Sequence, residues 1–222
     1  MEVEKTMEMQ RLLRGFARFF AVGWEGRGGD MNGKIGSTIL QRLGWLEERL
    51  PEAWMRRRAK EVRIAVEEGG LDALPVVLNH GDLLLSNIMV DEETRLTGLV
   101  DWAEAEYLSF GMSLYGVEHL LGRMIHATEC GRRICRFEYH QDAPNLRRHF
   151  WNCLLAEIPA LKGRQIWRAM LLSREVGILL WHGIAWDDGN LNRVVNEQDD
   201  GEELAYLEAF FTSDVGFTNS ML

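Results

Sequence analysis

The chain has 222 residues, of which 46% are hydrophobic and 27% charged, and its formal net charge is −9. These values are typical of an ordinary globular protein, and we expect one domain over residues 1–222. An acidic chain offers no broad electropositive surface, which argues against nucleic acid and anionic membranes as partners. Residues 1–10 lack the basic start and apolar run of a secretory signal, and no later stretch reaches about 18 uninterrupted apolar residues. We therefore expect a cytoplasmic protein.

The first part of the chain is predicted to be helical. Apolar residues recur every three to four positions over residues 12–20, and Gly23 is the expected end of this helix. Residues 24–36 are rich in glycine, which predicts a loop. Ser37 then suits the N-cap of a second helix, because its hydroxyl can accept a bond from a free backbone N–H in the first turn.

A third helix gives way to short strands. Pro51 suits the first turn of that helix, and Gly69-Gly70 is its expected end. From Pro75 the apolar runs shorten and are separated by polar turns, which predicts strands at residues 76–78, 88–90 and 96–100. Helical periodicity returns after Gly111, with helices expected around residues 114–124, 146–158, 165–181 and 202–211. Helices, a small strand cluster and further helices predict an α+β fold.

Polar residues stand at the ends of all three predicted strands. His80-Gly81-Asp82 follows the first strand, Asn87 opens the second, and Asp101 ends the third. Asp82 and Asn87 are five positions apart, the interval of the kinase catalytic loop, in which an Asp accepts the substrate proton and an Asn binds magnesium. A hairpin of the second and third strands would bring Asp101 beside Asn87. The simpler alternative is that these residues only end strands and form turns, as Asp and Asn often do.

The same residues suit phosphoryl transfer. A phosphoryl group in transfer needs a divalent metal to neutralise its oxygens, and Mg²⁺ prefers hard oxygen ligands such as a carboxylate and an amide carbonyl. Asn87 and Asp101 supply such a pair, which leaves Asp82 to orient an alcohol or accept its proton. We interpret His80 as a scaffold residue whose ring bonds the backbone near the loop.

Three segments carry a resemblance to a known family: His80-Gly81-Asp82-Leu83, Asn87-Ile88-Met89-Val90-Asp91 and Gly98-Leu99-Val100-Asp101-Trp102. Together they resemble the aminoglycoside phosphotransferase and choline-kinase-like family, and residues 101–107 are similar to fungal-type members. The resemblance implies the mainly helical C-terminal lobe of a protein-kinase-like fold, with the strand cluster bearing the catalytic loop. It also implies Asp82 as catalytic base, Asn87 and Asp101 as Mg²⁺ ligands, ATP or GTP as phosphate donor, and a small-molecule hydroxyl as acceptor.

Two positions depart from the pattern of that family. Residues 83–86 read Leu-Leu-Leu-Ser, where many members have a His-Pro-Gly-like turn. Ala103 separates Trp102 from Glu104, where members often have an acidic residue at once, and we assign Glu104 no role. The contacts that the loop makes with substrate are therefore expected to differ.

The N-terminal nucleotide-binding lobe of such kinases is expected to be absent. That lobe is rich in strands and carries a phosphate-covering loop and a strand lysine. The residues before Asp82 are predicted to be helical, and none of their lysines lies in an apolar strand: Lys5, Lys34 and Lys60. The alternative function is therefore a catalytically impaired kinase-like remnant that acts as a binding or interaction module, or a truncated product.

A dimer, or a partner that supplies the missing lobe, belongs to this alternative. Its expected signature is an exposed apolar face, because large exposed apolar patches commonly mark interaction sites. Solvent exposure of Phe16, Phe19 and Phe20 would favour such a partner, whereas burial of that face would favour a self-sufficient domain.

A partial P-loop match lies upstream. Gly28, Gly33 and Lys34 fit the first part of G-x-x-x-x-G-K, but Ile35 stands where Ser or Thr would bind magnesium. The residues before it are predicted to form a helix, whereas a P-loop follows a strand. We therefore favour an ordinary glycine-rich loop.

The cysteines, histidines and tryptophans have simple interpretations. The three cysteines make no pair of C-x-x-C motifs and have no zinc-like spacing to the nearby histidines, so ordinary thiols are expected at Cys130, Cys135 and Cys153. Hydrogen-bonded structural roles are expected for His119, His126 and His182. Core or groove packing is expected for Trp45, Trp54, Trp151, Trp167 and Trp181.

Overall fold

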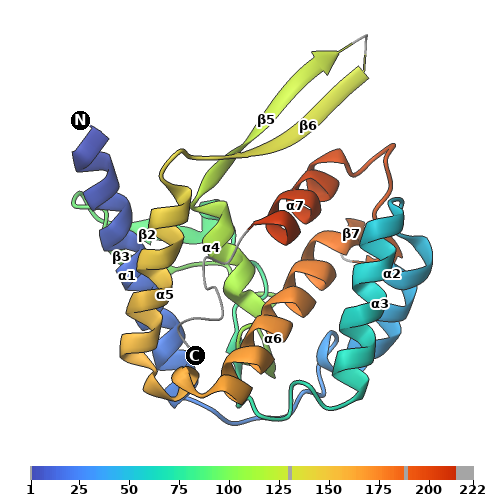
Figure 1. Cartoon of the computed structure of the whole chain (residues 1–222), viewed down its shortest axis with the longest axis horizontal. Coiled ribbons are helices and arrows are strands. Elements are labelled where there is room, and N and C mark those ends of the chain that lie inside the picture. Colours follow the sequence, from blue (N-terminus) through green and yellow to red (C-terminus); the bar gives the residue numbers. More distant parts are fainter. Residues whose placement is uncertain (1, 130–131, 188–189, 214–222) are drawn as a thin grey trace.

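The computed structural model describes residues 2–129, 132–187 and 190–213, so Cys130 lies outside the described residues. The fold is mixed α+β, as predicted (Figure 1). The helices are α1 (Glu2–Glu25), α2 (Ile39–Arg49), α3 (Ala53–Glu67), α4 (Gly116–His119), α5 (Ala143–Glu157), α6 (Arg164–Gly183) and α7 (Gly201–Thr212). The strands are β1 (Val76–Asn79), β2 (Ile88–Val90), β3 (Leu96–Leu99), β4 (Glu106–Ser109), β5 (Gly122–Glu129), β6 (Arg132–Tyr139), β7 (Ile184–Asp187) and β8 (Asn190–Val194). Short 3-10 turns cover Gly36–Thr38, Leu85–Asn87, Met112–Tyr115 and Pro159–Lys162.

The described strands pair two by two and antiparallel: β1 with β4, β2 with β3, β5 with β6, and β7 with β8. In β2–β3, Ile88 faces Leu99 and Met89 faces Gly98, before the register shifts at Val90. The first described strand is β1, which follows three helices. The strands therefore serve as supports for loops and do not form a central sheet.

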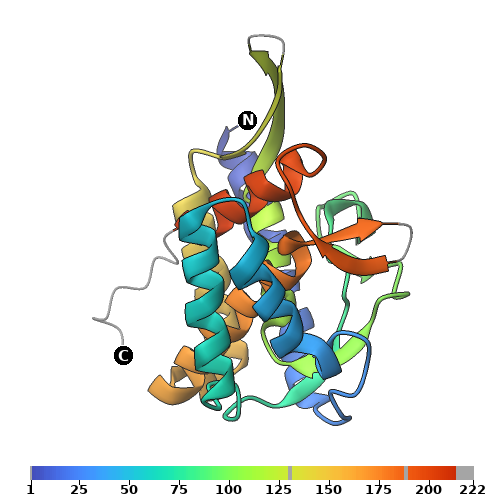
Figure 2. The ribbon, with the colours of Figure 1, turned by 90° about the vertical axis from the view of Figure 1, so that its right-hand side faces the viewer.

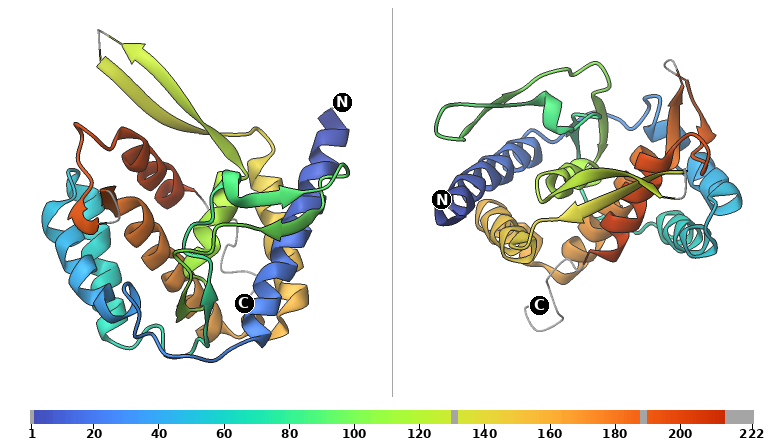
Figure 3. Two further views of the ribbon diagram at one scale, coloured as in Figure 1. Left: turned by 180° about the vertical axis from the view of Figure 1, so that it is seen from behind. Right: turned by 90° about the horizontal axis from the view of Figure 1, so that it is seen from above.

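The helices form two flanks around α6. Helices α1 and α5 pack side by side on one flank, and Figure 3 shows β3 beside α1. Helices α2 and α3 pack together on the other flank, with β8 against α2 (Figure 2). Helix α6 contacts α2, α3 and α7, so it joins the second flank to the C-terminal helix. None of the helices in the described residues has the length and apolar character that crossing a membrane requires.

The apolar face of α1 is covered from within the chain. Phe16 and Phe20 are buried, and Phe19 packs against the core while partly exposed. The ring of Phe20 lies 6.1 Å from that of Phe150 on α5, in an edge-to-face arrangement. Burying each such phenylalanine contributes ~1.5–3 kcal/mol. The face that could have marked a missing partner thus belongs to the core, which favours a self-sufficient domain.

Most predicted elements are confirmed. The strands expected at residues 76–78, 88–90 and 96–100 correspond to β1, β2 and β3, and the last three predicted helices correspond to α5, α6 and α7. Residue 69 has a φ of 81° and follows α3 closely, as expected of a helix-ending glycine.

The helix ends were predicted less well. Helix α1 continues past Gly23, because a glycine that keeps helical dihedral angles does not end a helix. Ser37 does not cap α2: its hydroxyl donates to the carbonyl oxygen of Gly33 at 2.6 Å. Thr38 takes the N-cap position, but its side chain makes no capping bond. Pro51 lies before α3, not in its first turn.

The helix predicted around residues 114–124 is wrong in its second half. Helix α4 ends at His119, and from Gly122 the chain forms β5, which pairs with β6 along its full length. A Cβ at Gly122 would lie 2.5 Å from both the carbonyl oxygen of Glu138 and the ring of Phe137, so the strands pack tightly there. Strands β4, β6, β7 and β8 were not predicted either.

Candidate functional site

A tight turn after β1 presents the loop of residues 80–87, hereafter the 80–87 loop. Gly81 has a φ of 77°, in the left-handed region that favours glycine. A Cβ at this position would lie 2.0 Å from the carbonyl oxygen of Glu104. Both the dihedral angle and the close approach of the second chain segment therefore require glycine between His80 and Asp82.

His80 is buried and ties the loop to the end of β3. Its Nε2 lies 2.9 Å from the carbonyl oxygen of Val100, and its Nδ1 accepts the backbone N–H of Asp82 at 3.3 Å. Its ring also packs against that of Trp102, with the centroids 4.5 Å apart. The prediction that this ring holds backbone near the loop is confirmed.

Asn87 fixes the carboxylate of Asp82. Its Nδ2 donates to Asp82 Oδ2 and to the Asp82 carbonyl oxygen, each at 2.9 Å. Because the amide nitrogen is committed to Asp82, the amide oxygen of the buried Asn87 is the atom that can serve a cation. The structure therefore brings Asp82 and Asn87, which stand five positions apart in the sequence, into direct contact.

Asp101 follows β3 at the same end of the hairpin. The backbone N–H of Val100 donates to the carbonyl oxygen of Asn87 at 3.0 Å, so the neighbouring Asp101 emerges beside Asn87. Asp101 is exposed and has a φ of 62°, which few non-glycine residues adopt. Such strain clusters at functional sites, where the surroundings hold it in place.

The pKa of Asp82 is raised above its ordinary value. Burial is the largest cause, the bond from Asn87 and the ring of His80 act in the opposite direction, and the charge of Asp101 raises the pKa further. Asp82 and Asp101 are thus close enough for their charges to interact. A cation bound near both carboxylates would reduce this repulsion.

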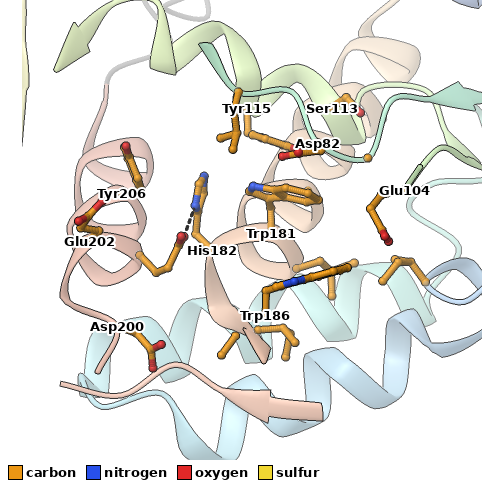
Figure 4. Close-up of a pocket in the computed structure, with 18 of the residues that line it drawn as sticks. Asp82, Glu104, Ser113, Tyr115, Trp181, His182, Trp186, Asp200, Glu202 and Tyr206 are labelled. Carbon is orange, nitrogen blue, oxygen red and sulfur yellow. Dashed lines mark hydrogen bonds and ion pairs between the residues drawn. The ribbon is translucent and has the colours of Figure 1, made fainter. Parts of the chain in front are cut away.

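A cavity of about 690 Å³ opens beside the 80–87 loop. Figure 4 shows Asp82 at this cavity together with Trp181 and Tyr206, which come from α6 and α7. Its walls combine aliphatic, aromatic and acidic side chains, and the described residues that line it include no Lys or Arg. Its acidic residues besides Asp82 are Glu104, Glu106, Glu197, Asp199, Asp200, Glu202 and Glu203.

Sequence reasoning missed most of this cavity. The acidic segment of residues 199–203 forms a loop and the start of α7, and it also lines the cavity, which no sequence pattern indicated. Trp181 was expected to pack in the core or in a groove; its ring stacks on Tyr115 at 5.4 Å and it lines the cavity. Burial, followed by the charges of Glu203 and Glu202, raises the pKa of Tyr206 to about 12, so its hydroxyl stays protonated at neutral pH.

The partial P-loop match is an ordinary loop, as favoured. Helix α1 precedes it where a P-loop would have a strand. The backbone N–H groups of Ile35 and Gly36 donate to the Glu106 carboxylate at distances of 2.9 and 2.6 Å. Lys34 Nζ lies 5.3 Å from the centroid of the Trp186 ring. The groups that a P-loop would offer to phosphate therefore contact protein.

Of the histidines with a predicted structural role, His182 is hydrogen-bonded as expected, whereas the buried Nε2 of His119 has no hydrogen-bond partner among the described residues. His119 and His182 are buried among aromatic rings, with their own centroids 5.3 Å apart. His182 Nδ1 lies 2.6 Å from Glu203 Oε2, and burial lowers the pKa of His119, with a further contribution from His182. His126 is exposed on β5 and is considered below.

The tryptophans and thiols also follow the prediction. Trp151 and Trp167 are buried, and the other packing tryptophans are partly buried against the core: Trp45, Trp54 and Trp181. Cys135 and Cys153 are unpaired thiols in the described part of the chain.

Residues 15–110 match the model of a phosphotransferase enzyme family. The matched segment runs from α1 to the end of β4 and contains Asp82, Asn87 and Asp101. This match supports the resemblance to aminoglycoside phosphotransferase-like proteins. Searches of curated proteins and of solved structures find no match to the chain.

Proposed function

We propose that the protein transfers the γ-phosphate of ATP or GTP to a hydroxyl group of a small molecule in a Mg²⁺-dependent reaction. The observation that carries this proposal is the contact between Asp82 and Asn87 at the edge of a cavity large enough for a small molecule. The phosphotransferase family match over the same residues supports it.

The chemistry follows from the roles that the geometry allows. Asp82 orients the acceptor hydroxyl and takes its proton as the hydroxyl oxygen bonds to the γ-phosphorus and the bond to the nucleoside diphosphate breaks. Its raised pKa makes it a better base than an ordinary aspartate. Asn87 and Asp101 would hold Mg²⁺, which when bound neutralises the charge of the phosphate oxygens. Their amide and carboxylate oxygens are the donor types that this ion prefers.

The cavity favours an acceptor with a positive charge. The carboxylates on its walls attract a cation, and the ring of Trp181 can contact one. No Lys or Arg among the described lining residues offers an anionic acceptor a counter-charge. We therefore propose a hydroxyl-bearing amine as the acceptor class.

A second proposal concerns the nucleotide. Three helices precede β1 in the described structure, so the strand lysine of a nucleotide-binding lobe has no counterpart there. Nucleotide contacts would then come from another polypeptide or a second copy, and the chain alone would act as a kinase-like binding module.

Calorimetry with ATP and GTP, with and without Mg²⁺, separates these proposals. The stand-alone kinase is expected to show saturable Mg²⁺-dependent binding that Asp101→Ala abolishes. Asp72→Ala, which removes an exposed carboxylate in the turn before β1, is the control and should bind as the parent does. If the folded parent binds neither nucleotide, the stand-alone reaction is excluded and the partner-dependent module is favoured.

Catalysis is tested by nucleoside diphosphate release in the presence of a panel of hydroxyl-bearing amines. Asp82→Asn should retain Mg²⁺–nucleotide binding but lower the transfer rate by about 10²–10⁴-fold, as expected for loss of a general base. A full rate in this variant would remove Asp82 from the mechanism.

A further inference from the structure

The β5–β6 hairpin carries a cysteine and a histidine on one face. His126 and Cys135 are direct cross-strand partners, so their side chains leave the hairpin on the same side. Figure 1 shows this hairpin extending beyond the helices, with α7 below it. Helix α7 packs against β6, and its first turn brings Glu202 to the same place.

The three side chains form a compact group of metal-ligand types. Cys135 Sγ lies 3.7 Å from His126 Nδ1, and Glu202 Oε1 lies 3.7 Å from His126 Nε2. One ligand atom of each residue can be chosen so that all lie within 4.8 Å of one another. Among the described residues, this is the single such group found.

We propose that His126, Cys135 and Glu202 form a binding site for Zn²⁺. Thiolate, imidazole and carboxylate are the ligands that zinc takes in proteins, with Zn–S near ~2.3 Å and Zn–N near ~2.0–2.1 Å. A tetrahedral ion with these bonds separates its sulfur and nitrogen ligands by about 3.6 Å. The observed distance of 3.7 Å between Sγ and Nδ1 fits that value. A rotation of the Glu202 side chain, which is 48% exposed, would complete the third bond.

The ion would join two parts of the chain at the edge of the cavity. Cys135 and Glu202 both line the cavity, one from the hairpin and one from α7. With three protein ligands, the fourth zinc position is open to water or to a ligand atom. Binding would therefore fix the hairpin against α7 and set the shape of the cavity rim. No pattern in the sequence indicates this site, because its ligands have no recognisable spacing along the chain.

The competing explanation is an exposed His–Glu pair beside an ordinary Cys–His contact. The chain contains a matched control for it, because Cys153 Sγ lies 3.5 Å from His149 Nε2 on α5. That pair is a Cys–His contact for which the described structure offers no third ligand. A site that depends only on a Cys–His contact would form there equally well.

The experiment titrates the reduced, metal-free chain with Co²⁺ and then with Zn²⁺. We expect a thiolate-to-Co²⁺ charge-transfer band and visible bands of a tetrahedral ion, saturating at one ion per chain and lost when Zn²⁺ displaces Co²⁺. Cys135→Ser should abolish the charge-transfer band. His126→Ala and Glu202→Gln should weaken binding by more than the roughly 10–100-fold that loss of an outer-shell group costs.

Cys153→Ser and Cys130→Ser are expected to bind Co²⁺ as the parent does. Zn²⁺ should also raise the melting temperature of the parent and of Cys153→Ser, but not that of Cys135→Ser. The proposal is overturned if no thiolate band appears, if the band survives Cys135→Ser, or if it disappears in Cys153→Ser or Cys130→Ser. Because these readouts need neither nucleotide nor acceptor, they stand apart from the proposed reaction.

Discussion

Two carboxylates, those of Glu118 and Asp82, have contrasting surroundings: Glu118 lies in the helical core, and Asp82 lies at the cavity. Glu118 in α4 is buried, and its side chain is 1% exposed. Its oxygens accept bonds from Arg147 at 2.7 Å and from Arg174 at 2.8 Å, so α4, α5 and α6 meet through one charge cluster. Burial alone would raise the pKa of Glu118, but the two arginines outweigh it and the pKa lies below its ordinary value.

Asp82 is half-buried, and its pKa is shifted in the opposite direction, above its ordinary value. Its side-chain partner is the neutral amide of Asn87, and no ion pair to Lys or Arg is formed by it within the described structure. Burial and the nearby Asp101 raise its pKa. The fold thus neutralises the charge of Glu118 internally and leaves that of Asp82 to whatever binds at the cavity. A perturbed and uncompensated carboxylate beside a cavity is a better functional candidate than a perturbed one in a closed cluster.

The largest expected effect is on the free energy of unfolding, when the buried cluster of Glu118, Arg147 and Arg174 is broken. Glu118→Gln leaves Arg147 and Arg174 buried without a counter-charge, which should lower the free energy of unfolding by about 3–5 kcal/mol. Urea denaturation measures this change. Glu61→Gln, which breaks an exposed pair with Arg58, is the control and should cost less than ~1 kcal/mol. A cost below that of the control would show that the cluster does not stabilise the fold.

The effect of pH follows from the same cluster. A carboxyl group whose pKa is lower in the folded state contributes stability above its unfolded pKa, about 4.3 for Glu, and loses it as the pH falls through the folded value. The difference in unfolding free energy between the parent and Glu118→Gln should therefore be full at pH 7 and narrow below about pH 4. Denaturation curves at a series of pH values check this, and a difference that does not change with pH would contradict the assignment.

The sequence predicts the region of the site better than its surroundings. Residues 80–101 contain local signals: short apolar runs and polar residues at their ends. A hairpin of the second and third strands also places Asn87 near Asp101. The bond of His80 to backbone was predicted from those signals, and the five-residue spacing singled out Asp82 and Asn87, which contact each other in the structure. Each of these contacts lies within one hairpin and the turn before it.

The rest of the candidate site depends on packing between distant elements. The cavity wall is formed by the 80–87 loop, α6 and α7. The periodicity of the sequence does not predict which faces of these elements pack together. The β5 segment has apolar residues that fit a helix equally well, and its partner strand and the cover of α7 decide the outcome. The Glu118 cluster was missed for the same reason, because its arginines come from two later helices.

The smallest expected effect tests the comparison most directly, because the same type of substitution should act with opposite sign at the two positions. A carboxyl whose pKa is raised by folding contributes its full stability below its unfolded pKa, about 3.9 for Asp, and loses it as the pH rises through the folded value. Asp82→Asn should therefore raise the free energy of unfolding at pH 7 slightly, by much less than Glu118→Gln lowers it, since an amide can still accept the bond from Asn87 without carrying the charge.

Asp91→Asn is the control, because bonds from Arg95 lower the pKa of Asp91 and its replacement should not stabilise the chain. Urea denaturation without Mg²⁺ measures both variants. If Asp82→Asn destabilised the protein as Glu118→Gln does, the charge of Asp82 would be satisfied by the fold itself. It would then be a structural carboxylate, and the argument that it awaits a cation and a substrate would fail.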